Sequence, residues 1–339
     1  MSPWAKVFSF QKTSLVSHFH MLPAVALTIP RTRKLRKALL TAAGHGTRLF
    51  PMTKIIRKEF MPVFDEQGNL KPLILANVEE ALAAGVEELA IIVREDERPL
   101  FSRLFSEPVR PEILERLSPA NQEYAARLQH IGEHLTLIPQ TEQKGLGHAI
   151  LSAKDWIGGE PFLLILGDHY FSSKTTLTCA SQLVEAYEGS EESTIGLVAA
   201  PASESYRFGC FVGEWLREGK VLSITRIVEK PDPDFARQYL TSGGTDSVLT
   251  AFGLYALKPA VLDYIERTIR EGKLERGEIG LTSALEEMRQ EIPLRGVVLE
   301  GERIDIGVPS AYEKAMSAAI QSAATPPALP PGSGPESPR

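Results

Sequence analysis

Apolar and polar positions are grouped along the chain in blocks that predict strands and helices in turn. Nearly continuous apolar runs of strand length are KALLTAA (37–43), LAIIV (89–93), LTLIPQ (135–140), FLLILGD (162–168) and TIGLVAA (194–200). Buried parallel strands have this character because both of their faces are covered. Between the runs lie amphipathic segments such as LILANVEEALAAG (73–85), which has apolar residues at helical spacing and ends on glycine. Repeated strand–helix units predict an α/β fold, with a Rossmann-like, doubly wound and mostly parallel sheet.

The pattern changes after Phe208. The stretch FGCFVGEWLREGKVLSITRIVEK (208–230) predicts two antiparallel strands that turn at REGK, and TAFGLYAL (250–257) predicts a further strand. We therefore expect a nucleotide-binding half followed by a mixed, antiparallel portion that binds a second substrate. The last expected helix is SAYEKAMSAAIQSAA (310–324).

Both ends of the chain differ in composition from the part between them. Residues 1–36 contain four serines and no acidic residue, and they run into the basic cluster RTRKLRK (31–37). This composition is typical of a transit peptide or a weak export signal, and the alternative is a true start at or near Met21. Residues 325–339 hold six prolines and are expected to be disordered. The folded domain is expected over residues 37–324.

Composition restricts the class of function. The net charge is −6 and the isoelectric point is about 5.8, whereas nucleic-acid-binding domains are usually basic, so no nucleic-acid partner is expected. Cys179 and Cys210 have no CxxC spacing, which argues against a disulfide framework or a zinc site and favours a reducing compartment such as the cytoplasm. No apolar run approaches the roughly 18 residues that cross a bilayer, so no membrane association is expected.

A glycine-rich and basic segment, TAAGHGTRLFPMTKIIRKEFMP (41–62), follows the first apolar run. A Rossmann loop needs GxGxxG, but Leu49 stands at the third glycine position, and the Walker pattern is absent. Gly44 and Gly46 would let backbone N–H groups approach phosphate oxygens, and Arg48 and Lys58 would neutralise a triphosphate. The alternative is a glycine turn beside a solvated basic face.

This segment resembles the signature G-x-G-T-R-x-x-P-x-T-x-x-x-x-K-x-x-x-P of sugar-phosphate nucleotidyltransferases. Further stretches resemble the same family in the same order: QTEQKGLGHAI (140–150), LILGDHYF (164–171), IVEKP (227–231), GEIGLTSAL (277–285) and IDIGVPSAY (304–312). Ordered matches over most of the chain are far more specific than one loop. Within the family, the likeness is greatest to the bacterial group that uses UTP and glucose 1-phosphate.

The resemblance implies a nucleotide-diphospho-sugar transferase fold and a Mg²⁺-dependent reaction. An oxygen of glucose 1-phosphate would attack the α-phosphate of UTP, without a covalent intermediate, to give UDP-glucose and pyrophosphate. Both substrates are anions, so positioning and electrostatics should carry the catalysis. By resemblance, Asp168 and Asp305 are the Mg²⁺ ligands, and Asp168 ends a strand, where open α/β sheets bind ligands. The implied catalytic residues are Arg48, Lys58 and Lys230.

The resemblance also assigns binding residues. Those implied for the nucleotide are Ala43, Gly44, Gly46, Thr47, Gln140, Gly145 and Gly147, with the amide of Gln140 facing uracil and the last two glycines leaving room for its ring. Those implied for the sugar phosphate are Gly209, Glu229, Lys230 and Glu278. Relatives commonly form dimers or tetramers, so a homo-oligomer is expected.

Several positions depart from the family pattern. Ser283 replaces the usual aspartate of L-T-D, Gly280 replaces glutamine, and the insert DEQGNL (65–70) is expected to lengthen a hairpin near the site. We interpret His45 and His169 as packing residues rather than titrating groups. These departures bear on the sugar more than on the reaction.

Three alternatives remain open. They are a sister transferase for dTTP or another sugar 1-phosphate, a catalytically silent regulatory relative, and an NAD-dependent dehydrogenase. The missing third glycine disfavours the dehydrogenase, and retention of Arg48, Lys58, Asp168, Lys230 and Asp305 disfavours the silent relative.

Overall fold

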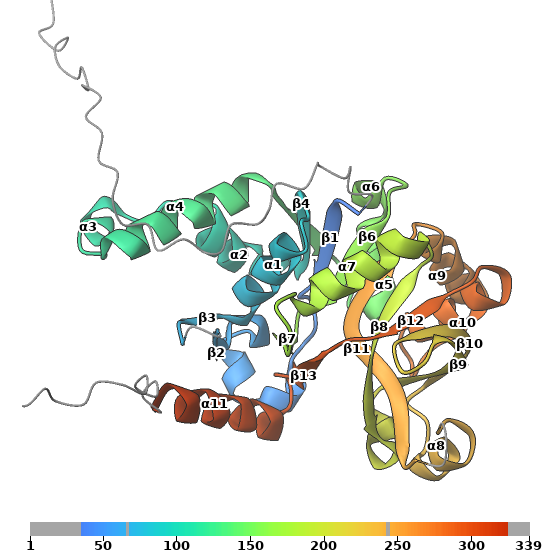
Figure 1. The fold of residues 1–339 in the computed structure, drawn as a ribbon. Coiled ribbons are helices and arrows are strands. Elements are labelled where there is room, and N and C mark those ends of the chain that lie inside the picture. The colour runs from blue at the N-terminus through green and yellow to red at the C-terminus, as the bar shows by residue number, and fades with distance from the viewer. Residues whose placement is uncertain (1–34, 66–67, 242–244, 325–339) are drawn as a thin grey trace, which may run out of the picture. The chain divides into compact units, whose positions relative to one another are not determined.

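The structure, a computed structural model, describes residues 35–65, 68–241 and 245–324. The predictions for the C-terminal tail and for the N-terminal extension up to residue 34 lie outside these ranges. In the described chain, a nine-stranded sheet runs in the order β5-β4-β1-β6-β11-β8-β12-β10-β9 (Figure 1). Its strands are β1 (Lys37–Thr41), β4 (Glu88–Arg94), β5 (Leu135–Gln140), β6 (Phe162–Leu166), β8 (Thr194–Pro201), β9 (Gly209–Arg217), β10 (Val221–Glu229), β11 (Ser247–Leu257) and β12 (Arg295–Val298).

The α/β prediction is confirmed, but the sheet is mixed rather than mostly parallel. Neighbours β5–β4, β4–β1, β1–β6 and β8–β12 are parallel, whereas β6–β11, β11–β8, β12–β10 and β10–β9 are antiparallel. The correction arises because β11 enters the centre of the sheet from late in the sequence. An apolar run does not reveal the direction of its neighbours. The predicted antiparallel pair at REGK is confirmed as β9 and β10.

Helices cover both faces of the sheet. The larger helices are α1 (Leu73–Ala83), α2 (Arg98–Phe105), α4 (Pro119–Glu133), α5 (Leu146–Ser152), α7 (Cys179–Ser190), α8 (Pro233–Tyr239), α9 (Val261–Arg270), α10 (Thr282–Glu291) and α11 (Pro309–Ala324). Alternate residues of β1 show the two layers, because Leu39 packs with the helices α5, α9 and α10, whereas Ala38 and Leu40 pack with α1, α2 and α7. The period of two along a strand assigns these side chains to opposite faces.

The two helices predicted from the sequence are present, as α1 and α11. The segment 73–85 forms α1, and Gly85 follows its end with φ of 81°. The segment after Gly145 is divided at Ala153 into α5 and the short α6 (Lys154–Ile157). No helix in the described ranges is long and apolar enough to cross a membrane.

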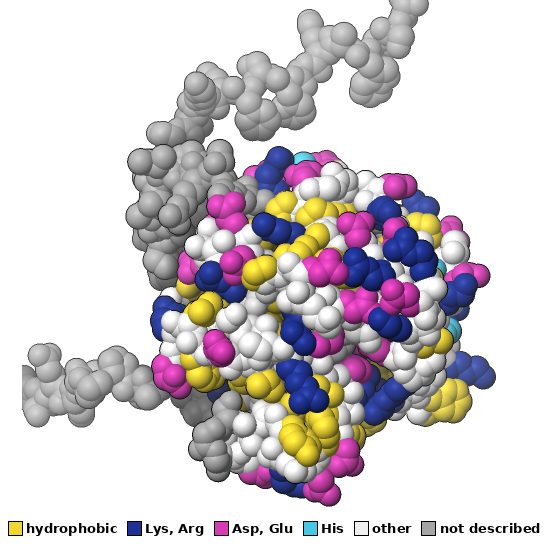
Figure 2. Space-filling model, turned by 90° about the vertical axis from the view of Figure 1, so that its right-hand side faces the viewer, with side chains coloured by type: hydrophobic (Ala, Val, Ile, Leu, Met, Phe, Trp, Pro, Cys, Tyr) yellow, Lys and Arg dark blue, Asp and Glu magenta, His cyan; other side chains and the backbone are white. Residues whose placement is uncertain are grey.

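Two small antiparallel pairs complete the fold. The predicted hairpin is formed by β2 (Pro62–Phe64) and β3 (Leu70–Pro72), and the described insert residues Asp65, Gly68 and Asn69 lie between these strands. The other pair, β7 (His169–Ser173) with β13 (Gly301–Asp305), was not expected from the amino-acid pattern. On the face shown in Figure 2, acidic and basic side chains are interspersed and form no basic stripe.

Candidate active site

The parallel strands β1, β4, β5 and β6 end at one edge of the sheet. β1 leads into Ala43 and the glycine loop, β4 ends at Arg94, β5 ends at Gln140, and β6 is followed by Asp168. Carboxyl ends of parallel neighbours meet at one edge, where open α/β sheets bind ligands. Predicted nucleotide residues and one predicted metal ligand therefore lie at the same edge of the sheet.

The glycine loop passes close to Lys58. A Cβ atom on Gly44 would lie 3.2 Å from Nζ of Lys58, and Gly46 has φ of 66°, which glycine adopts without strain. Ala43 is buried, whereas Thr47 is exposed at the start of a short 3₁₀ helix. The loop thus places bare backbone beside an ammonium group.

Lys58 is paired with the predicted metal ligand Asp168. Its Nζ donates a hydrogen bond of 2.8 Å to Oδ2 of Asp168. Burial alone would raise the pKa of Asp168, but the charge and hydrogen bond of Lys58, together with the nearby His169 and Arg48, outweigh it and hold this pKa well below the usual range. Burial opposes the charge of Lys58, yet Asp168 and Glu59 raise its pKa above the ordinary value. Both groups are therefore held in their charged forms.

The second predicted metal ligand reaches the site through the β7–β13 ladder. Asp305 lies opposite His169 in this ladder, and the backbone N–H of Ile306 donates to the carbonyl of Asp168 at 3.0 Å. Asp305 in turn accepts from Arg48, with 3.0 Å from Nη1 to Oδ2. Two cations of the glycine-rich segment and two carboxylates from distant parts of the chain are thereby brought together.

Gly307 explains the late D-x-G motif. Its N–H donates to Oδ1 of Asp305 at 2.9 Å, and a Cβ atom there would lie 2.8 Å from Nη2 of Arg48. A larger residue at this position would push the guanidinium away from the carboxylate. The glycine therefore makes room for the Arg48–Asp305 pair.

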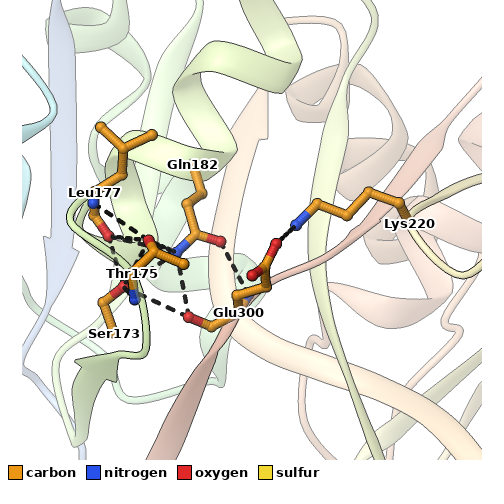
Figure 3. Close-up of polar contacts among 6 residues, drawn as sticks. All are labelled: Ser173, Thr175, Leu177, Gln182, Lys220 and Glu300. Carbon is orange, nitrogen blue, oxygen red and sulfur yellow. Dashed lines mark hydrogen bonds and ion pairs between the residues drawn. The ribbon is translucent and has the colours of Figure 1, made fainter.

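The opposite end of the β7–β13 ladder is held by Gln182 on α7, as Figure 3 shows. The carboxamide oxygen of Gln182 accepts from the N–H of Glu300 at 2.9 Å, and its nitrogen donates to the Glu300 carbonyl at 3.2 Å and to Oγ of Ser173 at 3.1 Å. Lys220 pairs with the Glu300 carboxylate at 2.5 Å. These bonds fix the turn from which β13 runs to Asp305.

A buried charged network that sequence reasoning missed lies beneath the glycine loop. Arg57 donates to the Gly44 carbonyl and lies 2.9 Å from Glu97. Glu59 is fully buried, with Arg57 at 3.7 Å and Lys58 at 3.8 Å as its nearest cations and no hydrogen bond to either carboxylate oxygen. Burial raises the pKa of Glu59 to about 7. Position 57 is variable in the family signature, so only its buried charge could have drawn attention to it.

His45 and His169, which were both interpreted as packing residues, differ in burial. His169 is buried, stacks obliquely near Phe171, and has a pKa lowered mainly by burial, as a packing role requires. His45 is exposed, with Nδ1 at 3.3 Å from Nη1 of Arg94, so the packing interpretation was wrong for His45.

The expected base-binding loop packs against the segment around Ile279. Gln140 is buried, and its Nε2 lies 3.2 Å from Nδ1 of His148 and 3.4 Å from the Gly145 carbonyl. A Cβ atom on Gly145 would lie 2.6 Å from the Ile279 carbonyl, and one on Gly147 would lie 2.8 Å from the Gly280 carbonyl. These glycines thus permit close backbone packing, a reason different from the room for a ring that the resemblance implied.

Three of the four predicted sugar-phosphate residues lie together, with Gly209 and Lys230 next to Glu229. Its Oε2 accepts from the hydroxyl of Thr282 at 2.8 Å, and its Oε1 lies 3.0 Å from Nζ of Lys230. A Cβ atom on Gly209 would lie 3.3 Å from the same carboxylate. Lys230 has φ of 44°, which is uncommon for a residue with a side chain, and its N–H donates to the Phe208 carbonyl. Backbone strain at functional positions commonly directs a side chain into a site.

Glu278 is exposed, and its segment offers a different carboxylate to this cluster. Glu275 accepts from the N–H of Ser283, and a Cβ atom on Gly280 would overlap the Glu275 carboxylate. The two departures from the family pattern therefore have one cause: Gly280 makes room for Glu275, and Ser283 avoids placing a second carboxylate beside it. Sequence reasoning missed Glu275.

The donor set at Asp168 and Asp305 fits Mg²⁺. Magnesium usually binds one or two carboxylates and completes its coordination with substrate phosphates and waters. Both aspartates lie at the joined ends of β6, β7 and β13, beside the two cations that would contact those phosphates. Their carboxylates are partly exposed, at 22% and 11% of the side chain, and so are open to an ion.

A family model described as nucleotidyl transferase matches residues 37–322. The chain belongs to the nucleotidyl transferase family. Among curated members, the UTP–glucose-1-phosphate uridylyltransferase of Staphylococcus haemolyticus (strain JCSC1435) is 34% identical over 277 residues, covering 81% of this chain and 88% of that protein. The UTP–glucose-1-phosphate uridylyltransferase 1 of Staphylococcus saprophyticus subsp. saprophyticus is 35% identical over 275 residues, with the same coverage of both chains.

Solved structures of nucleotidyl transferases share this fold. A UDP-glucose pyrophosphorylase complexed with UDP-glucose has a TM-score of 0.70 and 31% identity, over 85% of this chain and 99% of that chain. The UTP-bound enzyme from Acinetobacter baumannii has a TM-score of 0.69 and 26% identity, over 87% and 95%. The family and the α/β architecture that the sequence predicted are therefore confirmed.

Proposed function

We propose that this chain transfers the uridylyl group of UTP to glucose 1-phosphate and releases pyrophosphate. One observation carries the proposal: Lys58–Asp168 and Arg48–Asp305, four signature residues from distant segments, meet at the carboxyl edge of the sheet. The relatives named for UTP and glucose 1-phosphate support this choice of substrates.

Lys58 and Arg48 bind the triphosphate. In the described structure, Lys58 and Arg48 neutralise the two aspartates. On binding of the nucleotide they turn to its phosphate oxygens, where they offset the charge that develops on the departing pyrophosphate. Gly44 and Gly46 let the loop backbone approach the same oxygens.

Asp168 and Asp305 would hold Mg²⁺, which would supply charge neutralisation at the phosphates. The aspartates suit this role because neighbouring positive charge keeps Asp168 ionised. A carboxylate that stays ionised throughout the neutral range offers the ion a constant ligand.

The sugar phosphate is placed by the cluster around Glu229. Lys230 attracts the phosphate, and Glu229, held by Thr282, accepts hydrogen bonds from sugar hydroxyls. This arrangement sets the phosphate oxygen in line with the α-phosphorus, without a covalent intermediate. Glu275 adds a carboxylate to this side of the site.

Gln140 contacts the base. Its amide nitrogen donates to the Gly145 carbonyl and lies within hydrogen-bond distance of Nδ1 of His148, and these contacts orient the side chain so that its oxygen can accept from the N3–H of uracil. Thymine presents the same edge. A sister transferase for dTTP is therefore the second candidate, and the shape around the C5 position decides between them.

The test is pyrophosphate release by the full chain with Mg²⁺. The grid combines UTP, dTTP, ATP, GTP and CTP with glucose, galactose and N-acetylglucosamine 1-phosphates. We expect UTP with glucose 1-phosphate to give the highest kcat/KM. A different dominant pair would keep the reaction and change the substrates. If no substrate pair released pyrophosphate although the chain still bound UTP, the chain would instead be a catalytically silent regulatory relative.

A further inference from the structure

A group of potential metal ligands lies away from the candidate active site, at the end of α4. His130, Glu133 and His134 each offer one ligand atom, and these atoms lie within 4.8 Å of one another. All three side chains are exposed, so a dissolved ion can reach them. In the described ranges, it is the one group of three or more such side chains gathered this closely.

Helix geometry brings the three side chains together. Positions i, i+3 and i+4 share one face, and the rings of His130 and His134 have centroids 5.1 Å apart at 81°. Nδ1 of His130 lies 3.1 Å from Oε2 of Glu133. A carboxylate oxygen accepts, so this contact favours the tautomer with hydrogen on Nδ1, and in the neutral imidazole the lone pair is then on Nε2. A carboxylate that orients a histidine in this way is the usual second partner of a metal-binding imidazole.

We propose that His130 and His134 bind a transition-metal cation of the Zn²⁺ or Cu²⁺ class, with Glu133 orienting His130. Imidazole nitrogen suits zinc, copper and nickel, whereas magnesium prefers oxygen ligands. The site is thus chemically distinct from the one at Asp168 and Asp305. Its remaining coordination positions face solvent and are filled by water.

Binding here stabilises the junction of α4 with the sheet. His134 follows the last residue of α4, its N–H donates to the Ile131 carbonyl at 3.1 Å, and its carbonyl accepts from Leu89 of β4 at 3.2 Å. An ion bridging His130 and His134 therefore links the last helical turn to the start of β5. Because the ion binds the folded state through this geometry, it raises the melting temperature as its concentration rises. Gln140 lies at the other end of β5, so turnover is unaffected.

The experiment is calorimetric titration of the full chain with ZnCl₂, in excess MgCl₂ to occupy the aspartates. A His18→Ala/His20→Ala background is run in parallel, because these histidines are also present in the chain. We expect one equivalent of zinc to bind in both. The further change His130→Ala/His134→Ala should abolish that binding and the zinc-dependent rise in melting temperature. Glu133→Ala should weaken it about 10- to 100-fold.

Glu123→Ala is the matched control, since it removes an exposed carboxylate from the same helix. It should bind zinc as the wild type does. Zinc binding that persists unchanged in the His130→Ala/His134→Ala variant, or no saturable binding in the His18→Ala/His20→Ala background, would overturn the proposal. Neither result bears on nucleotidyl transfer.

Discussion

The two lysines that the resemblance implies as catalytic, Lys58 and Lys230, lie in different surroundings. The side chain of Lys58 is 13% exposed, pairs with Asp168 from the turn between β6 and β7, and has its Nζ 3.8 Å from the buried carboxylate of Glu59. The side chain of Lys230 is 36% exposed and pairs with the residue before it in sequence, Glu229. The pair of the nucleotide-side lysine is therefore long-range and buried, whereas the pair of the sugar-side lysine is local and more exposed.

This difference has a physical consequence. Buried ion pairs are weakly screened and hold their geometry, whereas exposed pairs contribute little and move readily. We infer that the nucleotide side is organised before substrate binds, and that the sugar side is ordered by the sugar phosphate itself. Changes on the two sides should then have different sizes.

The largest expected effect is on the aspartates. Asp305→Asn should lower kcat by more than about 1000-fold, because the lost ligand removes several kcal/mol of charge stabilisation. Asp168→Asn should have a similar effect. The measurement is steady-state pyrophosphate release, with thermal unfolding to verify the fold. Glu302→Gln, an exposed position of the same strand, is the control and should be near normal. A near-normal rate in either aspartate variant would remove that residue from the metal site.

The next effect is a pH-dependent change in stability at Glu59. Its pKa rises from 4.5 to about 7 on folding, so the folded state holds an extra proton between these values. The stabilisation from that proton is complete below pH 4.5 and is lost as the pH rises to about 7, with a total of about 3 kcal/mol. The difference in unfolding free energy between Glu59→Gln and the wild type should therefore shift in favour of the variant as the pH is raised from 5 to 8. Urea unfolding at pH 5 and pH 8 measures these free energies. An equal difference between variant and wild type at the two pH values would contradict a raised pKa for the buried carboxylate.

A smaller effect is expected on the sugar side. Lys230→Ala should raise the KM for glucose 1-phosphate and lower kcat, with kcat/KM falling by about 10- to 100-fold, the usual range for one charged hydrogen bond. Lys174→Ala, which removes an exposed surface lysine, is the control. If the KM for UTP alone changed, the assignment of Lys230 to the sugar phosphate would be wrong.

The smallest effect tests the support of Glu229. Thr282→Val removes the hydroxyl that donates to Oε2 of Glu229, and we expect a rise of about 2- to 10-fold in the KM for glucose 1-phosphate. Thr282→Ser keeps the hydroxyl and should restore the KM. Equal loss in both variants would show that packing, not the hydrogen bond, matters at this position.

Much of the fold was predictable from local pattern. The apolar runs at 37–43, 89–93 and 162–168 became adjacent parallel strands, and the REGK turn became the β9–β10 hairpin. The direction and central position of β11 were not predictable, because a buried strand has the same apolar pattern beside either kind of neighbour. The short β7 and β13 escaped prediction since three- to five-residue polar strands have no clear periodicity.

The candidate site was predictable wherever a motif carried it. Arg48, Lys58 and Asp168 stand in recognisable patterns, but Arg57, Glu59 and Glu275 do not. Their importance arises from burial and from partners distant in sequence, such as Glu97 for Arg57. Charged residues are common on surfaces, so a sequence alone does not show which ones are buried.

The order of amino acids determined the phosphate-loop signature, the apolar strands and the family. The tertiary structure alone decided that Asp305 meets Arg48, that Asp168 holds Lys58, and that Gly280 makes room for Glu275. The reason is that local pattern acts through the spacing of neighbours along the chain. Charge pairing instead depends on distance in space and on burial, which exist only once the strands have been placed side by side.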